Sequence, residues 1–140
     1  MNQATSSVVK SLGYGFAVET RLGFEEAERK VRELLKDEGF GVLTEIDVKN
    51  TLKEKLQVEF RRYKILGACN PPLAHRALTI EPAIGLLLPC NVVIEDYDGG
   101  SRVLFLDPVP ALGIVGNPEL EPLAADAAAR LRRVAQAMTR

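Results

Sequence analysis

The chain has 140 residues, of which 46% are hydrophobic and 26% charged, values that are ordinary for one soluble globular domain. Eighteen basic and nineteen acidic residues give a formal net charge of -1, so the chain lacks the basic excess of a general nucleic-acid binder. The longest apolar stretch, residues 83–90, is far below the roughly 20 residues that span a bilayer. The polar start has no secretory pattern, and two cysteines favour a reduced, cytoplasmic protein. We therefore expect neither a nucleic-acid nor a membrane partner.

The first part of the chain predicts a tail, a strand and a helix. Residues 1–12 carry no periodic pattern and are expected to form a flexible tail, so that residues 13–140 make up a single domain. Apolar residues alternate from Gly13 onward, which is typical of a strand. From Phe24 the apolar residues recur at helical spacing between charged ones, which predicts an amphipathic helix that ends at Gly39.

The middle of the chain repeats this alternation. Residues 40–46 alternate as a strand does, and Asp47 is well placed to cap a short helix after it. Residues 63–69 predict a third strand. Asn70 with Pro71 is a helix start, in which asparagine caps and proline occupies the first turn, and Pro82 limits that helix to about three turns.

The last part of the chain predicts a hairpin and a long helix. The apolar run of residues 86–94 indicates a buried loop that enters a central strand, because Pro89 interrupts it. Residues 98–101 (DGGS) predict a hairpin turn, and residues 109–116 a loop. Asn117 with Pro118 repeats the helix start, before a long amphipathic helix. The order β-α-β-α-β-α-β-β-α predicts an α+β fold with two layers, in which helices pack on one face of a mainly antiparallel sheet.

Few residue patterns in the sequence indicate chemistry. The glycine pairs at residues 13–15 and 39–41 lack the third glycine of a dinucleotide fingerprint and are interpreted as strand entries. The single histidine, His75, excludes a metal site made of several histidines in one chain. It falls on the polar side of its predicted helix, which indicates a solvated side chain, with a ligand role as the alternative.

The two cysteines are the best candidates for a functional site. Cys69 and Cys90 each stand where a strand meets a loop, and each is followed by an asparagine, Asn70 or Asn91. Cys69 also directly precedes a helix start, where the helix dipole favours a thiolate. If their strands are neighbours, the two thiols could face each other across one end of the sheet. The alternative is that both are buried structural cysteines, which behave as small hydrophobic residues.

Two glutamates complete the set of candidates. Asp47 and Asp107 are explained by helix capping and turn chemistry, whereas Glu45 and Glu81 have no such role in the predicted elements. An exposed glutamate needs none. The candidate ligand-binding residues are therefore Cys69, Asn70, Cys90, Asn91, Glu45, Glu81 and His75, with no metal ligands and no assigned catalytic residue.

Three separated blocks of the sequence resemble domain-of-unknown-function family 302. They are residues 38–47 (EGFGVLTEID), residues 63–71 (YKILGACNP), and residues 81–82 with 85–92 (EP, GLLLPCNV). The resemblance extends from about Gly13 to Met138. It implies a small prokaryotic α+β domain that is commonly a homodimer. It implies no settled reaction, although some members look associated with sulfur metabolism and others with haem.

Several functions agree with these observations. The first is a homodimeric binding module for a small molecule or a sulfur compound, with the two thiols as polar anchors of an apolar pocket. The second is a sulfur-transfer enzyme that carries a persulfide on Cys69, with Glu45 or Glu81 as its base. A haem-binding dimer would depend on His75 or on a cysteine ligand. The last is a purely structural dimer. We expect the binding module, because no nucleophile–base pair can be assembled from the sequence.

Overall fold

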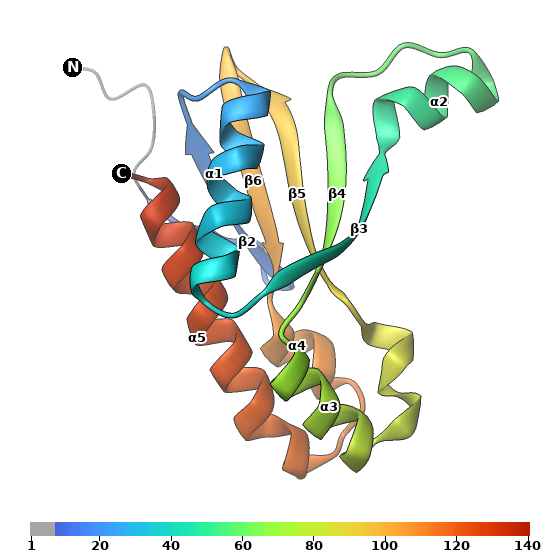
Figure 1. Cartoon of the computed structure of the whole chain (residues 1–140), viewed down its shortest axis with the longest axis vertical. Coiled ribbons are helices and arrows are strands. Elements are labelled where there is room, and N and C mark those ends of the chain that lie inside the picture. The colour runs from blue at the N-terminus through green and yellow to red at the C-terminus, as the bar shows by residue number, and fades with distance from the viewer. Residues whose placement is uncertain (1–7) are drawn as a thin grey trace.

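A computed structural model describes residues 8–140 and shows helices packed against one antiparallel sheet (Figure 1). The strands are β1 (Lys10–Ser11), β2 (Gly15–Thr20), β3 (Gly41–Asp47), β4 (Tyr63–Cys69), β5 (Cys90–Tyr97) and β6 (Gly100–Leu106). The helices are α1 (Phe24–Asp37), α2 (Val48–Leu56), α3 (Pro71–Ile80), α4 (Pro108–Gly113) and α5 (Glu121–Met138), with the short 3₁₀ helices η1 (Pro82–Leu87) and η2 (Pro118–Leu120).

The predicted α+β class and the predicted order of elements are confirmed. The structure adds β1, η1, α4 and η2 to that order. Within the predicted tail, residues 1–7 lie outside the described residues, whereas Lys10 and Ser11 pair with β2 at the edge of the sheet. Residues 109–116, predicted as a loop, lie largely in α4, because the side chain of Asp107 accepts a hydrogen bond from the Val109 N–H and so caps a helical turn.

The sheet has six strands in the order β1-β2-β6-β5-β4-β3, and every neighbouring pair is antiparallel. The two strands that carry the cysteines are neighbours, since Ala68 of β4 pairs with Cys90 of β5. A shift of register lies between Val42 and Thr44 on β3. This irregularity leaves Leu43 between the paired positions, at the end of the sheet where the cysteines lie.

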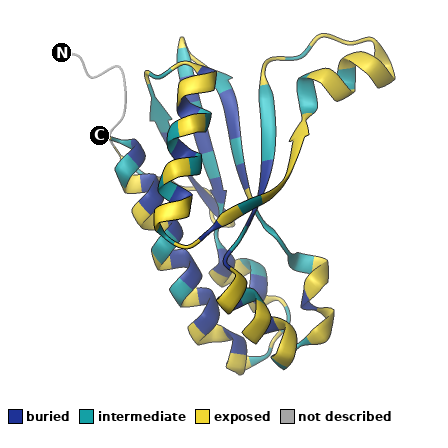
Figure 2. Cartoon of the chain, in the orientation of Figure 1, coloured by how far each residue is buried: buried dark blue, intermediate teal, exposed yellow. Residues whose placement is uncertain are grey.

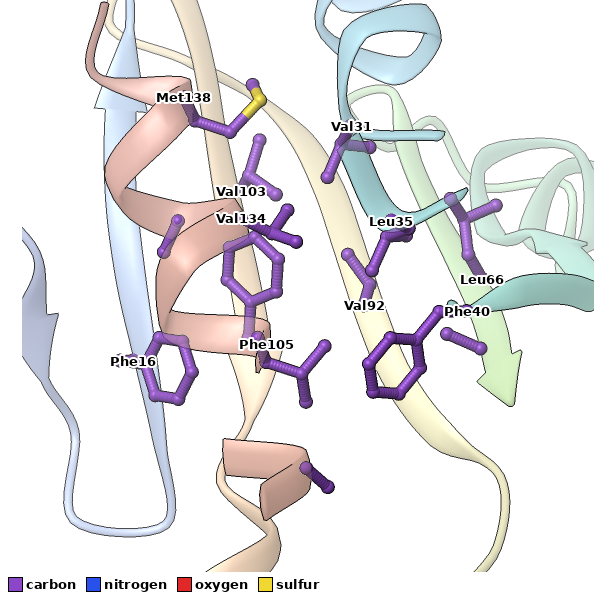
Figure 3. Close-up of a cluster of buried hydrophobic side chains, with 14 of the residues drawn as sticks. Phe16, Val31, Leu35, Phe40, Leu66, Val92, Val103, Phe105, Val134 and Met138 are labelled. Carbon is purple, nitrogen blue, oxygen red and sulfur yellow. The ribbon is translucent and has the colours of Figure 1, made fainter. Parts of the chain in front are cut away.

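The core lies between the sheet and the two helices α1 and α5. Phe16 of β2 stacks on Phe105 of β6 with ring centroids 5.4 Å apart, beneath Val134 of α5 (Figure 3). Leu35 of α1 packs beside Leu66 of β4 in the same cluster. The inward sides of both helices are buried and their outward sides exposed, as their helical spacing predicts (Figure 2).

The short helices α3, η1 and α4 gather beyond one end of β4, β5 and β6 (Figure 1). The chain passes from β4 into α3 through Asn70, whose side chain accepts a hydrogen bond from the Leu73 N–H. It enters β5 from η1, and it leaves β6 through the Asp107 cap of α4. α5 runs past both the sheet and these helices, so the core continues beyond the sheet into a second region enclosed by helices.

Helix α2 is much less buried than the others. Asp47 caps it as predicted, by accepting a hydrogen bond from the Asn50 N–H at 2.9 Å. None of its residues is buried, and it extends away from the ends of β3 and β4 (Figure 2). Among residues 8–140, no helix combines the length and the apolar character that crossing a membrane requires.

Candidate functional site

A cavity of about 290 Å³ lies between the end of the sheet and the short helices. Its wall is formed by apolar side chains, both cysteines and one asparagine, and no charged side chain of the described residues lines it. The lining residues are Phe40, Leu43, Ala68, Cys69, Asn70, Leu73, Ala74, Ala77, Leu78, Gly85, Leu88, Pro89, Cys90, Pro108, Leu112, Leu123 and Ala127.

The two thiols share the wall of this cavity, as the prediction of neighbouring strands requires. Cys69 ends β4 and Cys90 begins β5, and the register that pairs Ala68 with Cys90 leaves the two cysteines offset by one residue. Both are free and partly buried.

Both thiols are held in the protonated form at neutral pH. Burial raises the pKa of Cys69 above its ordinary value. Burial, followed by the proximity of Cys69, raises the pKa of Cys90 to about 11. The position of Cys69 before the start of α3 suggested a thiolate from the sequence, but desolvation in the apolar wall has the opposite effect.

Asn70 serves mainly to fix the corner between β4 and α3. Its side-chain oxygen caps α3, and its Nδ2 donates to the carbonyl oxygen of Glu38 at 3.5 Å. Arg130 of α5 donates to the same carbonyl at 3.1 Å. Gly39, the residue after Glu38, has φ +86°. A Cβ at this position would lie 2.9 Å from Asn70 Nδ2, so only glycine leaves room for the hydrogen bond between Asn70 and Glu38. The Cys69 corner is therefore tied to two other elements.

A glycine also controls the other side of the corner. Gly67 of β4 lies between Thr44 of β3 and Pro89, the residue before Cys90. A Cβ at Gly67 would overlap Thr44 Oγ1 and would lie 2.7 Å from Pro89 Cγ. The absence of a side chain lets Pro89 settle against β4, which brings Cys90 and the cavity wall to this end of the sheet.

Four of the predicted site residues do not line the cavity in the described part of the chain. Asn91 pairs with Gly67 and is exposed, and His75 is exposed on α3, as its helical position predicted. Glu81 precedes η1 and accepts a hydrogen bond from Asn117 Nδ2 at 3.4 Å. Glu45 forms ion pairs elsewhere, with Arg32 of α1 and Lys64 of β4.

Glu45 belongs to an ionic cluster that joins α1 to the edge of the sheet. Lys64 bridges Glu28 and Glu45 at 2.9 and 3.6 Å, and Arg32 contacts both carboxylates. Burial is the largest single effect on Glu28 and raises its pKa, but Lys64 and Arg32 together outweigh it and the pKa lies below its ordinary value. These groups neutralise one another, so the cluster is a structural tie rather than a catalytic base.

Sequence reasoning missed most of the cavity wall. Leu73, Ala74 and Ala77 come from α3, Leu112 from α4, and Leu123 and Ala127 from α5. Their spacing in the sequence is that of ordinary core residues, so it does not distinguish a cavity wall from a filled core. The one signal available is the small side chains on facing helices, because alanines leave space where longer residues would fill it. No group of three or more potential metal ligands occurs within residues 8–140.

The fold and the cavity together define a small α+β domain with an apolar site between its sheet and its short helices. The model of the family "Domain of unknown function DUF302" matches residues 16–138, and the chain belongs to this family. It is similar to the crystal structure of an uncharacterized conserved DUF302 protein from Bacillus stearothermophilus, with 32% identity and a TM-score of 0.83 over 91% of this chain and 99% of that one. No curated protein matches it.

Proposed function

We propose that the chain is a binding module for a small, uncharged, largely apolar molecule that occupies the cavity beside Cys69 and Cys90. The observation that carries the proposal is the composition of the wall: a cavity of about 290 Å³ is lined almost entirely by apolar side chains and by no charged side chain that could hold an ionic ligand. Ligand pockets typically measure about 300–1,000 Å³, so the occupant is smaller than a drug-sized molecule.

The rim of the cavity supports an apolar occupant. Leu43 and Leu78 both line the cavity and are 66% and 40% exposed. Large aliphatic side chains at an opening extend the apolar surface outward, where a ligand first makes contact. The two free thiols suit the reducing cytoplasm, which is the location we propose.

Binding agrees better with this site than sulfur-transfer catalysis does. A persulfide carrier needs a thiolate and a base within hydrogen-bond reach. Burial raises the pKa of both thiols, and no acidic or basic side chain of residues 8–140 lines the cavity. A haem-binding function in this cavity would depend on a cysteine ligand, because His75 lies outside the wall.

A sulfur compound is the second candidate for the occupant. Two protonated thiols in an apolar wall offer polarizable contacts to a neutral thiol or thioether, which a purely aliphatic wall would not. A ligand of this class differs from an alcohol of equal length by one atom, so the two candidates can be compared directly.

A displacement experiment tests the proposal. N-phenyl-1-naphthylamine, a neutral dye whose fluorescence rises in apolar surroundings, is titrated into the purified chain and displaced by straight-chain 1-alkanols of increasing length. Because each buried methylene contributes about 0.8 kcal/mol, we expect the Kd to fall by about fourfold per methylene until the cavity is full. Alkanoates of equal length should bind more weakly, because the wall holds no cation. Tighter binding of 1-alkanethiols than of matched alkanols would favour a sulfur compound.

A matched pair of variants locates the binding site. Ala74→Phe fills the cavity from α3 and should abolish displacement by the alkanols. Ala129→Phe adds the same side chain at an exposed position of α5 outside the cavity and should leave binding unchanged. Equal alkanol affinities in both variants, or affinities that do not depend on chain length, would contradict the proposal.

A further inference from the structure

A second cavity, of about 470 Å³, lies between α4, η2 and the first turns of α5. Small and aliphatic residues form most of its wall, and its polar side chains are Asn117 and Glu121. No basic side chain within residues 8–140 lines it. This second cavity borders the one that contains Cys69 and Cys90, which we call the cysteine cavity.

The two cavities are separated by the side chain of Leu112 on α4. Pro108 of α4 lines the cysteine cavity, and the next residue, Val109, lines the second cavity. Leu123 and Ala124 of α5 divide between the two in the same way. Among the described residues, Leu112 alone lines both cavities, and it is only 8% exposed. A side chain that contacts two spaces and almost no solvent stands between them.

Helix α4 is held at both ends, which fixes the backbone that carries Leu112. At its start, the Asp107 carboxylate caps the helix and accepts a hydrogen bond from Arg132 of α5 at 3.2 Å. The Asp107 N–H also donates to the carbonyl oxygen of Tyr14, before β2, at 3.0 Å. At its end, the Val115 N–H donates to the Leu112 carbonyl oxygen at 3.1 Å. A buried leucine on a fixed backbone has few rotamers open to it, so the cysteine cavity ends at this side chain.

We propose that Leu112 is a specificity-determining residue, which limits the ligand of the cysteine cavity to short neutral molecules and excludes long-chain amphiphiles. This inference rests on the proposed function, because it concerns the ligand of the same cavity. A long-chain alcohol would need the space of both cavities, with its tail beside the cysteines and its hydroxyl group near Asn117 and Glu121. Leu112 stands in that path.

Truncation of Leu112 differs from truncation of another wall residue. Leu112→Ala removes part of a side chain and also opens the cysteine cavity into the further 470 Å³ of the second cavity. Leu73→Ala removes the same atoms from α3, but Leu73 lines only the cysteine cavity. It therefore adds no more than the volume of the atoms lost. The two leucines are 8% and 9% exposed, so the variants are matched in burial.

Displacement of N-phenyl-1-naphthylamine by 1-alkanols of increasing length tests the proposal. For each chain, the length limit is the alkanol beyond which a further methylene no longer lowers the Kd. We expect Leu73→Ala to raise this limit by about three methylenes, the number of carbons removed, and Leu112→Ala to raise it further. Each methylene contributes about fourfold, so an alkanol about six methylenes beyond the native limit should bind Leu112→Ala about fiftyfold more tightly than Leu73→Ala.

Filling the second cavity should restore a limit. Ala125 is exposed and lines only the second cavity, so Ala125→Phe narrows that space and leaves the cysteine cavity unchanged. The double variant Leu112→Ala/Ala125→Phe should have a length limit near that of Leu73→Ala. Ala125→Phe alone should keep the native limit, because Leu112 still closes the cysteine cavity.

A milder variant keeps the proposal testable if Leu112→Ala does not fold. Leu112→Val shortens the side chain by one carbon and disturbs the packing less than alanine does. It should raise the length limit by about one methylene. Urea unfolding of each variant shows whether it is folded under the conditions of the titration.

The outcomes separate this inference from the proposed function. A length limit in Leu112→Ala no higher than that in Leu73→Ala would overturn the inference, because the two cavities would then remain separate. A native limit that no Leu112 variant moves would do the same and would leave the proposed function standing. Alkanol binding by Leu112→Ala but not by the native chain would support the role of Leu112 and contradict the proposed function. Absence of binding in every chain would contradict both.

Discussion

At the scale of single residues, the environment of a side chain decides its chemistry more than its type does. Glu95, Glu45 and Cys69 each have polar or reactive groups, yet their neighbours give them quite different roles. Glu95 is buried beneath two arginines, so removing either arginine would leave a buried carboxylate less well paired. Cys69 lies in an apolar wall, which keeps its thiol neutral.

The pKa of Cys90 predicts how stability depends on pH. Its folded-state pKa of about 11 lies above the ordinary value of 9.0, so the folded state keeps the thiol proton to higher pH than the unfolded state does. The associated stability is complete below pH 9 and is lost as the pH rises toward 11. Two pKa units correspond to at most about 3 kcal/mol in the free energy of unfolding.

Urea denaturation of the native chain and of Cys90→Ala at pH 8, 9, 10 and 11 measures this effect. We expect the native chain to lose more stability than the variant between pH 9 and pH 11, by up to about 2 kcal/mol. The comparison with the variant removes the contributions of the other titrating groups. Parallel pH dependences would show that Cys90 titrates alike in the folded and unfolded states.

At the scale of elements, the end of the sheet near the cysteines depends on close approach between segments. Gly67 allows β3, β4 and the segment before β5 to meet, because its neighbours Thr44 and Pro89 occupy the space that a Cβ would need. The approach positions Cys90 in the cavity wall. A side chain at Gly67 should therefore disturb both the packing of the strands and the site.

Gly67→Ala should destabilise the fold by about 1–2 kcal/mol. Overpacking typically costs about 1–3 kcal/mol, and the reduced entropy of the unfolded chain offsets about 0.4–1 kcal/mol of it. The matched control is Gly41→Ala, on the neighbouring strand, where a Cβ would meet no atom within 4 Å. Thermal and urea unfolding of both variants measures the difference. If both alanines had the same effect, the close approach at Gly67 would not matter for stability.

The elements could be predicted from the sequence where one local pattern determined them. Asn70 and Asp47 cap their helices as predicted, because capping depends on a few adjacent residues. Asp107 caps α4 in the same way. This helix is only six residues long, however, and the pattern of its apolar residues does not distinguish a helix from a loop. The register shift on β3 likewise left no sequence signal, since it depends on pairing with β4.

The site could be predicted only in part. Cys69, Asn70 and Cys90 were indicated by their positions at strand ends, and the neighbouring strands bring them to one cavity. The apolar wall comes from segments as far apart as Phe40 and Ala127. Each of its residues has the pattern of a core residue, and only the three-dimensional packing shows that they leave a space between them.

At the scale of the whole molecule, the cavity lies where distant parts of the chain meet. Its wall is built from the ends of β4 and β5 and from α3, α4 and α5. The cavity therefore exists only when the sheet and the helices beyond its end are assembled together.

This arrangement predicts that a ligand of the cavity stabilises the whole fold. A ligand that binds only the folded chain raises the free energy of unfolding by RT ln(1 + [L]/Kd), which is about 2.7 kcal/mol at a concentration of about 100 times Kd. Urea unfolding of the native chain with and without a 1-alkanol at that concentration should show this increase, and Ala74→Phe, whose added side chain fills the cavity, should show none. Equal stabilisation of both chains would mean that the alkanol binds outside the cavity, because filling the space between the sheet and the short helices would then have made no difference.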